Sequence, residues 1–237
     1  MADKKAESIV ERPLAEVISA SIMAVSAEAV TTHGAAPNVG PRAQFGSFVK
    51  IVSPENSIDI YAVVYDVITG PPDNVHKPAA LGMSRDQLRL EQPHIFSLLK
   101  THLQAAIVGY GQVSESTSRN RNKTRDAALF QHLPPQPPQV HDFVYLAAPE
   151  QILALTADFD FLNLLTHVTA VPTDELIAAA LRQAAGARRS SGGNLDEDNN
   201  DHEVAYLLEA GRAISQLFRS DYDRMVSIIK KIRPQPG

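Results

Sequence analysis

The stretch FGSFVKIVSPENSIDIYAVVYDVIT, residues 45–69, shows the clearest strand pattern in the chain and decides the expected fold. In residues 45–52 the side chains alternate between two faces, as they do in a strand. Residues 58–69 are rich in β-branched and aromatic residues, and the turn PENS between the two segments predicts a hairpin. Because both faces of the second segment are apolar, we expect a closed barrel or a sheet beneath covering helices.

Further strands are expected on both sides of this hairpin. Residues 14–33 predict one or two strands, and residues 103–111 resemble a strand that ends at glycine. Residues 83–101 look helical, with a break at Pro93, and would form a helical insertion in the sheet. The apolar and aromatic residues of 140–147 predict the last strand.

Four prolines lie within residues 134–138, just before this last strand. Proline cannot donate to a strand ladder and fixes φ, so the run predicts an extended, preorganised spacer. Such a spacer would deliver the last strand to pair with the first strand and close the sheet, which removes exposed edges. A PxxP ligand for an aromatic groove is the alternative interpretation.

From Pro149 onward the pattern becomes helical. Residues 149–186 predict helices, and the hydrophilic residues 187–201 predict a polar linker. Residues 202–233 have a four–three apolar rhythm that predicts one long amphipathic helix. This stripe either packs on its own domain or binds a partner or a second copy. Its candidate partner-binding residues are Leu207, Ile214, Phe218, Met225 and Ile229.

Composition limits the class of protein. Apolar residues make up 44% of the 237 and charged residues 21%, which are ordinary globular values. The net charge of −5 argues against a surface coated in positive charge for nucleic acid, although one local basic patch is still allowed. The sequence has no cysteine, which excludes disulfides and thiolate chemistry. Without a signal-peptide pattern or a long apolar run, a cytoplasmic protein with no membrane partner is expected.

One local basic patch occurs in the segment SRNRNKTRD. If this loop contacts phosphates, four cations would give a salt slope near ~3.6 on a log–log plot for duplex DNA. No aromatic residue interleaves these cations, so base stacking by the loop itself is unsupported. A solvated loop is the other interpretation. The candidate nucleic-acid-binding residues are Arg119, Arg121, Lys123 and Arg125.

We found no pattern that predicts catalysis, a metal site or a cofactor. A phosphate loop needs G-x-x-x-x-G-K-[ST], and residues 186–193, GARRSSGG, lack the lysine. The histidines lack metal-site spacing, and residues 195–201 lack the glycine and final glutamate of a calcium loop. Asp158 and Asp160 are interpreted as capping residues near a helix start. We therefore expect no catalytic residue and no enzyme activity.

The segments FGSFVKI, IYAVVYDV, RLEQPHIFSLLKT, IVGYG and PPQVHDFVYLA occur in an order that resembles the HAS-barrel family. That family is a small β-barrel domain at the N-terminus of HerA-type DNA translocases, with a relative in F1-type ATP synthase subunits. The similarity covers residues 13–148 and implies a closed barrel that docks on a larger ATPase or nuclease assembly, or on copies of itself. The chain lacks the phosphate loop of the ATPase domain, so the resemblance transfers no catalytic residue.

These observations predict an α+β protein with an N-terminal closed barrel and a C-terminal helical region. We expect a non-catalytic interaction and assembly module with a protein partner or a homo-oligomeric partner. The alternative is a DNA-binding accessory protein that uses the basic loop 119–125.

Overall fold

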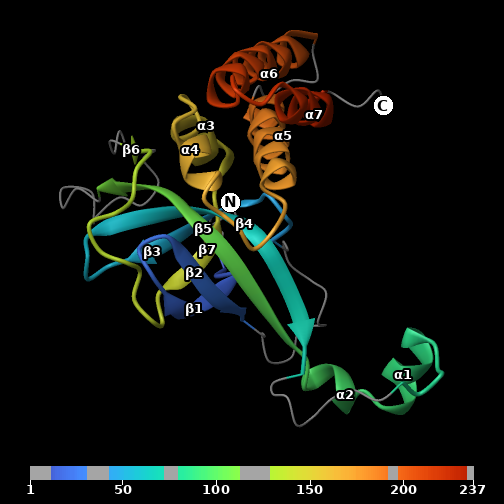
Figure 1. Cartoon of the computed structure of the whole chain (residues 1–237). Helices are drawn as coiled ribbons and strands as arrows, with labels where there is room; N and C mark the ends of the chain where they lie inside the picture. The colour runs from blue at the N-terminus through green and yellow to red at the C-terminus, as the bar shows by residue number, and fades with distance from the viewer. Residues whose placement is uncertain (1–11, 31–42, 72–79, 113–128, 192–196, 234–237) are drawn as a thin grey trace, which may run out of the picture.

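A computed structural model of the chain describes residues 12–30, 43–71, 80–112, 129–191 and 197–233. It has the expected α+β fold, in which a closed β-barrel lies beneath a group of C-terminal helices (Figure 1). A hairpin arm with two short helices extends from the barrel on the side away from that group (Figure 1).

Six antiparallel strands form the barrel, in the order β2-β1-β7-β3-β4-β5, and β2 pairs with β5 to close it. The short strand β6 pairs only with β5, outside the ring. The predicted hairpin and the pairing of the last strand with the first are both confirmed, the latter at Ala15 and Val144. The strand bounds are β1 Ala15–Ala20, β2 Ala24–Ala29, β3 Phe48–Ser53, β4 Ile58–Gly70, β5 Lys100–Gln112, β6 Leu129–Phe130 and β7 Phe143–Leu146.

The proline stretch connects β6 to β7 and is held against the barrel. Leu133, just before it, packs on the side chains of the barrel interior. Pro134 and Pro138 are buried, and the Asn56 side chain in the β3–β4 turn donates to the Pro137 carbonyl oxygen at 3.2 Å. The run therefore acts as the predicted spacer, and two of its prolines are not free for an aromatic groove.

The apolar residues of β4 and β5 serve two cores, which explains why both faces of β4 are apolar. One face fills the barrel interior with residues such as Ile60 and Ile107. The opposite face, which includes Val63 and Val108, packs under the C-terminal helices. At Gly46, with φ +85°, a Cβ atom would lie 2.6 Å from the Ala179 Cβ, so only glycine allows this close approach of barrel and helix.

Within the described residues from Pro149 onward, the C-terminal region has five helices. Helix α5 contacts α3, α6 and α7, and its buried residues lie at the centre of this region. The bounds are α3 Pro149–Leu155, α4 Phe161–Leu165, α5 Thr173–Ser191, α6 Glu197–Leu217 and α7 Tyr222–Ile232.

The prediction of a single long helix over 202–233 is wrong. Helix α6 ends at Leu217, and the Asp221 carboxylate accepts a hydrogen bond from the Arg224 N–H at 3.1 Å, which caps α7. Helix α7 then packs on α5, where Arg224 pairs with Asp174 at 2.6 Å. The apolar periodicity continues from α6 into α7 because the apolar faces of both helices are buried in the same core.

The predicted polar linker over 187–201 is also wrong at both ends. Helix α5 continues through Ser191, and α6 already begins at Glu197. Residues 192–196 lie outside the described part of the chain. Polar composition alone did not distinguish an exposed helix end from a linker.

The predicted helical insertion is present at the end of the β4–β5 arm. It consists of α1, Arg85–Glu91, and α2, His94–Ser97, with Pro93 between them as the predicted break. The second strand of the arm begins at Lys100. Strand β4 pairs with β3 only through Val63, and β5 pairs with β2 only from His102 onward, so the last β4–β5 pairs, up to Gly70 and Lys100, extend beyond the barrel wall.

Candidate docking site

The stripe predicted to bind a partner lies in the core of the helical region. Leu207, Ile214 and Phe218 are only 8%, 0% and 6% exposed, and Met225 and Ile229 pack half-buried against the same cluster. The prediction that these five residues form a partner surface is therefore wrong. The break before Tyr222 folds the two parts of the stripe onto α5, so the domain covers them itself.

The four cations of the predicted basic loop, at 119–125, lie outside the described residues. Residues Gln112 and Leu129 on either side of this segment belong to the paired strands β5 and β6. Three rings from these strands and the following turn lie together: Tyr110 and Phe130 have centroids 5.2 Å apart, and His132 lies 5.3 Å from Tyr110 and 5.4 Å from Phe130. Sequence reasoning did not find this cluster, because the loop separates its members.

The helices at the end of the arm are held by local contacts. A capping box begins α1, in which Ser84 Oγ accepts from the Gln87 N–H and Gln87 Oε1 accepts from the Ser84 N–H, at 3.2 and 3.0 Å. The guanidinium groups of Arg85 and Arg89 lie 5.4 and 5.6 Å from the centre of the Phe96 ring of α2. These contacts fix α1 against α2 without a hydrophobic core.

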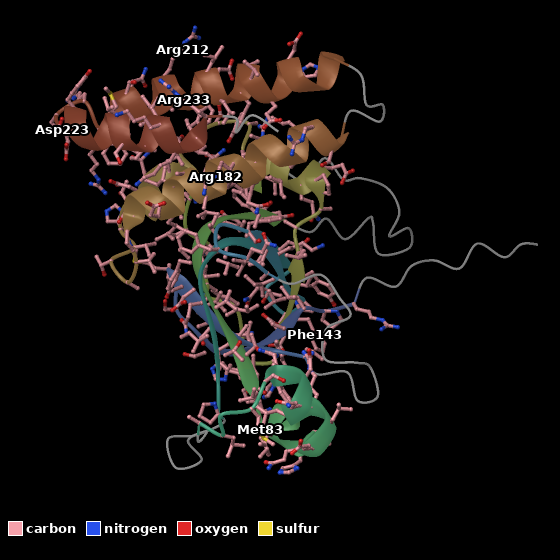
Figure 2. The ribbon with its side chains drawn as sticks, turned by 90° about the vertical axis from the view of Figure 1, so that its right-hand side faces the viewer. Met83, Phe143, Arg182, Arg212, Asp223 and Arg233 are labelled. Atoms are coloured by element: carbon pink, nitrogen blue, oxygen red, sulfur yellow. The ribbon has the colours of Figure 1, made fainter. Side chains whose placement is uncertain are left out.

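Three leucines remain exposed on this unit: Leu90 at 84%, Leu98 at 55% and Leu81 at 45%. We call them the arm tip. Helix α1 has no buried residue, and a helix of seven residues has little stability without packing. Figure 2 shows the unit, with Met83 labelled, at the opposite end of the molecule from Arg212 on α6. An exposed apolar group on a projecting element is typical of a docking surface.

The cations and anions of α1 balance. Arg85 and Arg89 are offset by Asp86 and Glu91, and Asp86 pairs with Arg89 at 3.3 Å. The apolar anchors are thus surrounded by both signs of charge, which is typical of the polar rim of a protein–protein contact.

A hollow of about 240 Å³ lies where the arm leaves the barrel, between the barrel and the α4–α5 connection. Its lining includes Met23, Tyr65, Leu133, Leu164, His167 and Val168. The Tyr65 hydroxyl donates to Gln104 Oε1 at 3.4 Å, and His167 Nδ1 lies 2.9 Å from the Asn163 carbonyl oxygen. The volume is below the ~300–1,000 Å³ of typical pockets for small molecules.

A second hollow, of about 230 Å³, lies between the ends of β3 and β7 and the helices α3 and α5. Its lining includes Gln44, Ser47, Ile152 and Gln183 and contains no titratable side chain. It offers no acid, base or nucleophile pair for chemistry.

The strongest pKa shift in the helical region belongs to a structural cluster. Burial raises the pKa of Tyr206 to about 12, although the nearby Arg188 favours the phenolate, and burial lowers the pKa of Arg188. Arg188 donates to Thr156 Oγ1 at 3.0 Å and to the Thr156 carbonyl oxygen at 2.9 Å. Neither Arg188 nor Tyr206 lines one of the two hollows.

Gln131 performs the capping role that was predicted for Asp158 and Asp160. Asp160 occupies the N-cap position of α4 but makes no side-chain cap hydrogen bond. The Phe161 N–H donates to Gln131 Oε1 at 2.9 Å, and Gln131 Nε2 donates to the carbonyl oxygens of Leu155 and Asp158 at 2.7 and 3.0 Å. This long-range cap had no signal in the local sequence.

No family model and no curated protein matches this sequence. Within the described ranges, no group of three or more His, Asp or Glu side chains is placed to hold a metal ion. No helix in the same ranges combines the length and the apolarity that crossing a bilayer requires.

Proposed function

We propose that this chain is a non-catalytic assembly module that docks through the arm tip on a protein partner. The observation that carries the proposal is the exposure of Leu90 on α1, which has no buried residue, together with that of Leu81 before α1 and Leu98 after α2. The resemblance of residues 13–148 to the barrel of HerA-type translocases suggests the class of partner. A larger ATPase or nuclease assembly fits it, and so does another copy of the chain.

The energetics of the tip favour binding over solvation. Burying one leucine completely contributes roughly 1.5–3 kcal/mol, so covering the three of the arm tip would give several kcal/mol. The β4–β5 pairing reaches Gly70 and Lys100 at the base of the tip, and an anchored tip loses less conformational freedom on docking than a free segment would. Preorganised apolar anchors with a polar surround are typical of interface hot spots.

Affinity capture from a lysate of the source cells tests this function. The bait would be the full chain as wild type, as Leu90→Asp and as Leu208→Asp. Leu208 is the matched control, because it is also a helical leucine, 64% exposed, on α6. We expect the wild type and the Leu208 variant to retain the same proteins and the Leu90 variant to lose them. Equal capture by all three baits would refute docking through the tip.

A second candidate function is DNA binding through the basic loop 119–125. The observation that favours it is the cluster of Tyr110, Phe130 and His132 on the strands that flank the loop, since rings there could add stacking to phosphate contacts. The test is titration of labelled duplex and single strands with wild type and with a variant whose four loop cations are glutamine. Binding that is absent, or that is insensitive to salt, removes this candidate.

A further inference from the structure

Strand β4 has an open edge where it runs along the arm. On the side of β3, its last backbone hydrogen bonds in the described residues are those of Val64 with Gly46 and Ser47. Beyond them, residues 66–70 pair only with β5 among the described strands, and β4 and β5 continue past the barrel toward α2 (Figure 1). We call the side of residues 66–70 that faces away from β5 the arm edge.

The backbone of the arm edge offers hydrogen-bonding groups at alternate residues. The Val67 N–H donates to the carboxylate of its neighbour Asp66 at 2.9 Å, so it points away from the ladder with β5. Successive residues of an antiparallel strand direct their N–H and C=O groups to opposite sides, so those of Thr69 point the same way as those of Val67. The edge therefore presents donors and acceptors at the spacing of a strand.

The side chains along the edge suit a strand as neighbour. Val67 and Ile68 are 38% and 50% exposed, and Thr69 is exposed as well. All three are β-branched, and β-branched side chains pack well against the side chains of an adjacent strand.

Asp66 gives the edge a negative charge that no cation balances. In the part of the chain that the structure describes, its carboxylate accepts the Val67 N–H and forms no ion pair. Lys100, on the other strand of the arm, is paired with Glu28. A cation opposite Asp66 on an added strand would therefore gain a cross-strand ion pair, and an anion there would be repelled.

We propose that the arm edge adds an extended strand of a partner protein, which has β-branched side chains and a lysine or arginine opposite Asp66. Backbone groups at strand spacing are matched along their length by another extended polypeptide, and this selects the class of partner. In the free protein the Asp66 carboxylate holds the Val67 N–H and so protects the edge from unspecific pairing. This inference concerns a surface other than the arm tip and does not depend on Leu90.

Titration of the full chain with two labelled peptides tests the proposal. The first is acetylated and amidated Thr-Val-Lys-Val-Thr-Val, and the second has glutamate in place of the lysine. We expect the wild type to bind the lysine peptide roughly threefold to fivefold more tightly than the glutamate peptide, and Asp66→Lys to reverse the order. Hydrogen exchange measured by NMR should show that the bound peptide slows exchange of the Thr69 amide roughly tenfold or more.

A pair of variants at Val67 tests the backbone contact. Val67→Pro removes the outward N–H and should weaken binding of the lysine peptide roughly tenfold. Val67→Thr keeps both the N–H and the β-branched shape and should bind like the wild type. Thermal unfolding checks that each variant is folded, and if Val67→Pro is not, the Thr69 exchange and the charge reversal still decide.

Failure to bind either peptide, or binding that leaves Thr69 exchange unchanged, overturns the addition of a strand. Equal preference for the two peptides in the wild type and in Asp66→Lys overturns the selection by charge. A wild-type dimer in sedimentation that Val67→Pro abolishes would make a second copy the occupant and overturn the assignment to a partner protein.

The variant Leu90→Asp separates this inference from the proposed function. It should bind the lysine peptide like the wild type, because Leu90 lies on α1 and not on the arm edge. If it loses the peptide, the peptide binds at the arm tip and the arm edge is not the site. If no peptide binds while Leu90→Asp still loses captured proteins, docking through the tip stands and strand addition fails.

Discussion

The guanidinium carbon of Arg188 lies 3.5 Å from the centre of the Tyr206 ring. This contact joins α5 to α6, and the hydrogen bonds of Arg188 to Thr156 extend it to the end of α3. A cation over an aromatic face, with its donors directed at carbonyl and hydroxyl oxygens, stabilises the packing of three helices.

Removal of the Arg188 guanidinium should destabilise the protein. In Arg188→Met the apolar stem remains, but the hydrogen bonds to Thr156 and the ring contact are lost. We expect a decrease of about 2 kcal/mol in the free energy of unfolding, measured by urea titration. Arg189→Met is the matched control, because Arg189 forms an ion pair with Glu203 at 3.4 Å and its side chain is 66% exposed. If Arg189→Met lowered the free energy of unfolding by more than about 1 kcal/mol, the stabilising effect could not be assigned to the contacts of Arg188.

Stability should fall at alkaline pH because of Tyr206. Its pKa is raised from 10.0 to about 12 by burial, so the folded state keeps the phenol proton where the unfolded chain releases it. The protonated phenol of Tyr206 contributes fully to the free energy of unfolding below pH 10. This contribution, on the order of 2–3 kcal/mol, is lost as the pH rises toward 12. Urea unfolding across this range, compared with Tyr206→Phe, measures the effect. If the free energy of unfolding fell equally with pH in the wild type and in Tyr206→Phe, Tyr206 would not be the cause of the alkaline loss.

Loss of the Gln131 side chain should weaken the contact between the barrel and the helices. Gln131→Ala leaves the Phe161 N–H and the Leu155 carbonyl oxygen without this partner. We expect a decrease of about 1–3 kcal/mol in the free energy of unfolding. The control is Gln136→Ala, whose exposed side chain lies in the proline stretch and should change stability little. Similar losses for the two variants would argue against the capping role.

An added methyl group at Gly46 should be costly. Both Gly46 and Gly82 have positive φ, +85° and +67°, so alanine at either position adds backbone strain of roughly 1–2 kcal/mol. Only at Gly46 would the new Cβ also meet Ala179, at 2.6 Å, whereas nothing lies within 4 Å at Gly82. Gly46→Ala should therefore lower the melting temperature clearly more than Gly82→Ala. Equal decreases in melting temperature for the two variants would mean that α5 moves away from the new Cβ atom without cost.

The sequence predicted those parts of the fold that depend on local pattern. The alternation in residues 45–52 and the two apolar faces of residues 58–69 predicted a hairpin with two covered sides, and β4 indeed serves two cores. The break at Pro93 was predicted because proline disfavours a continuous helix whatever its surroundings. Backbone chemistry and side-chain periodicity are readable without knowledge of distant contacts.

The candidate site was not predictable in the same way. Leu90 and Leu207 are the same residue type at helical positions, yet Leu90 is 84% exposed and Leu207 is 8% exposed. The difference depends on whether another element lies beside the helix, which periodicity does not reveal. The sequence did contain one local signal for the start of α1, the pair Ser84 and Gln87 of the capping box, and one for the α6–α7 break, the capping residue Asp221.

The way the arm joins the barrel has a mechanical consequence. Strand β4 continues from the arm into a ladder with β3, and β5 continues into a ladder with β2. A force on α1 and α2 along the strands would load these ladders in shear, so that many hydrogen bonds resist it at the same time. The tip would then transmit the force to the barrel wall before the β4–β5 hairpin separates.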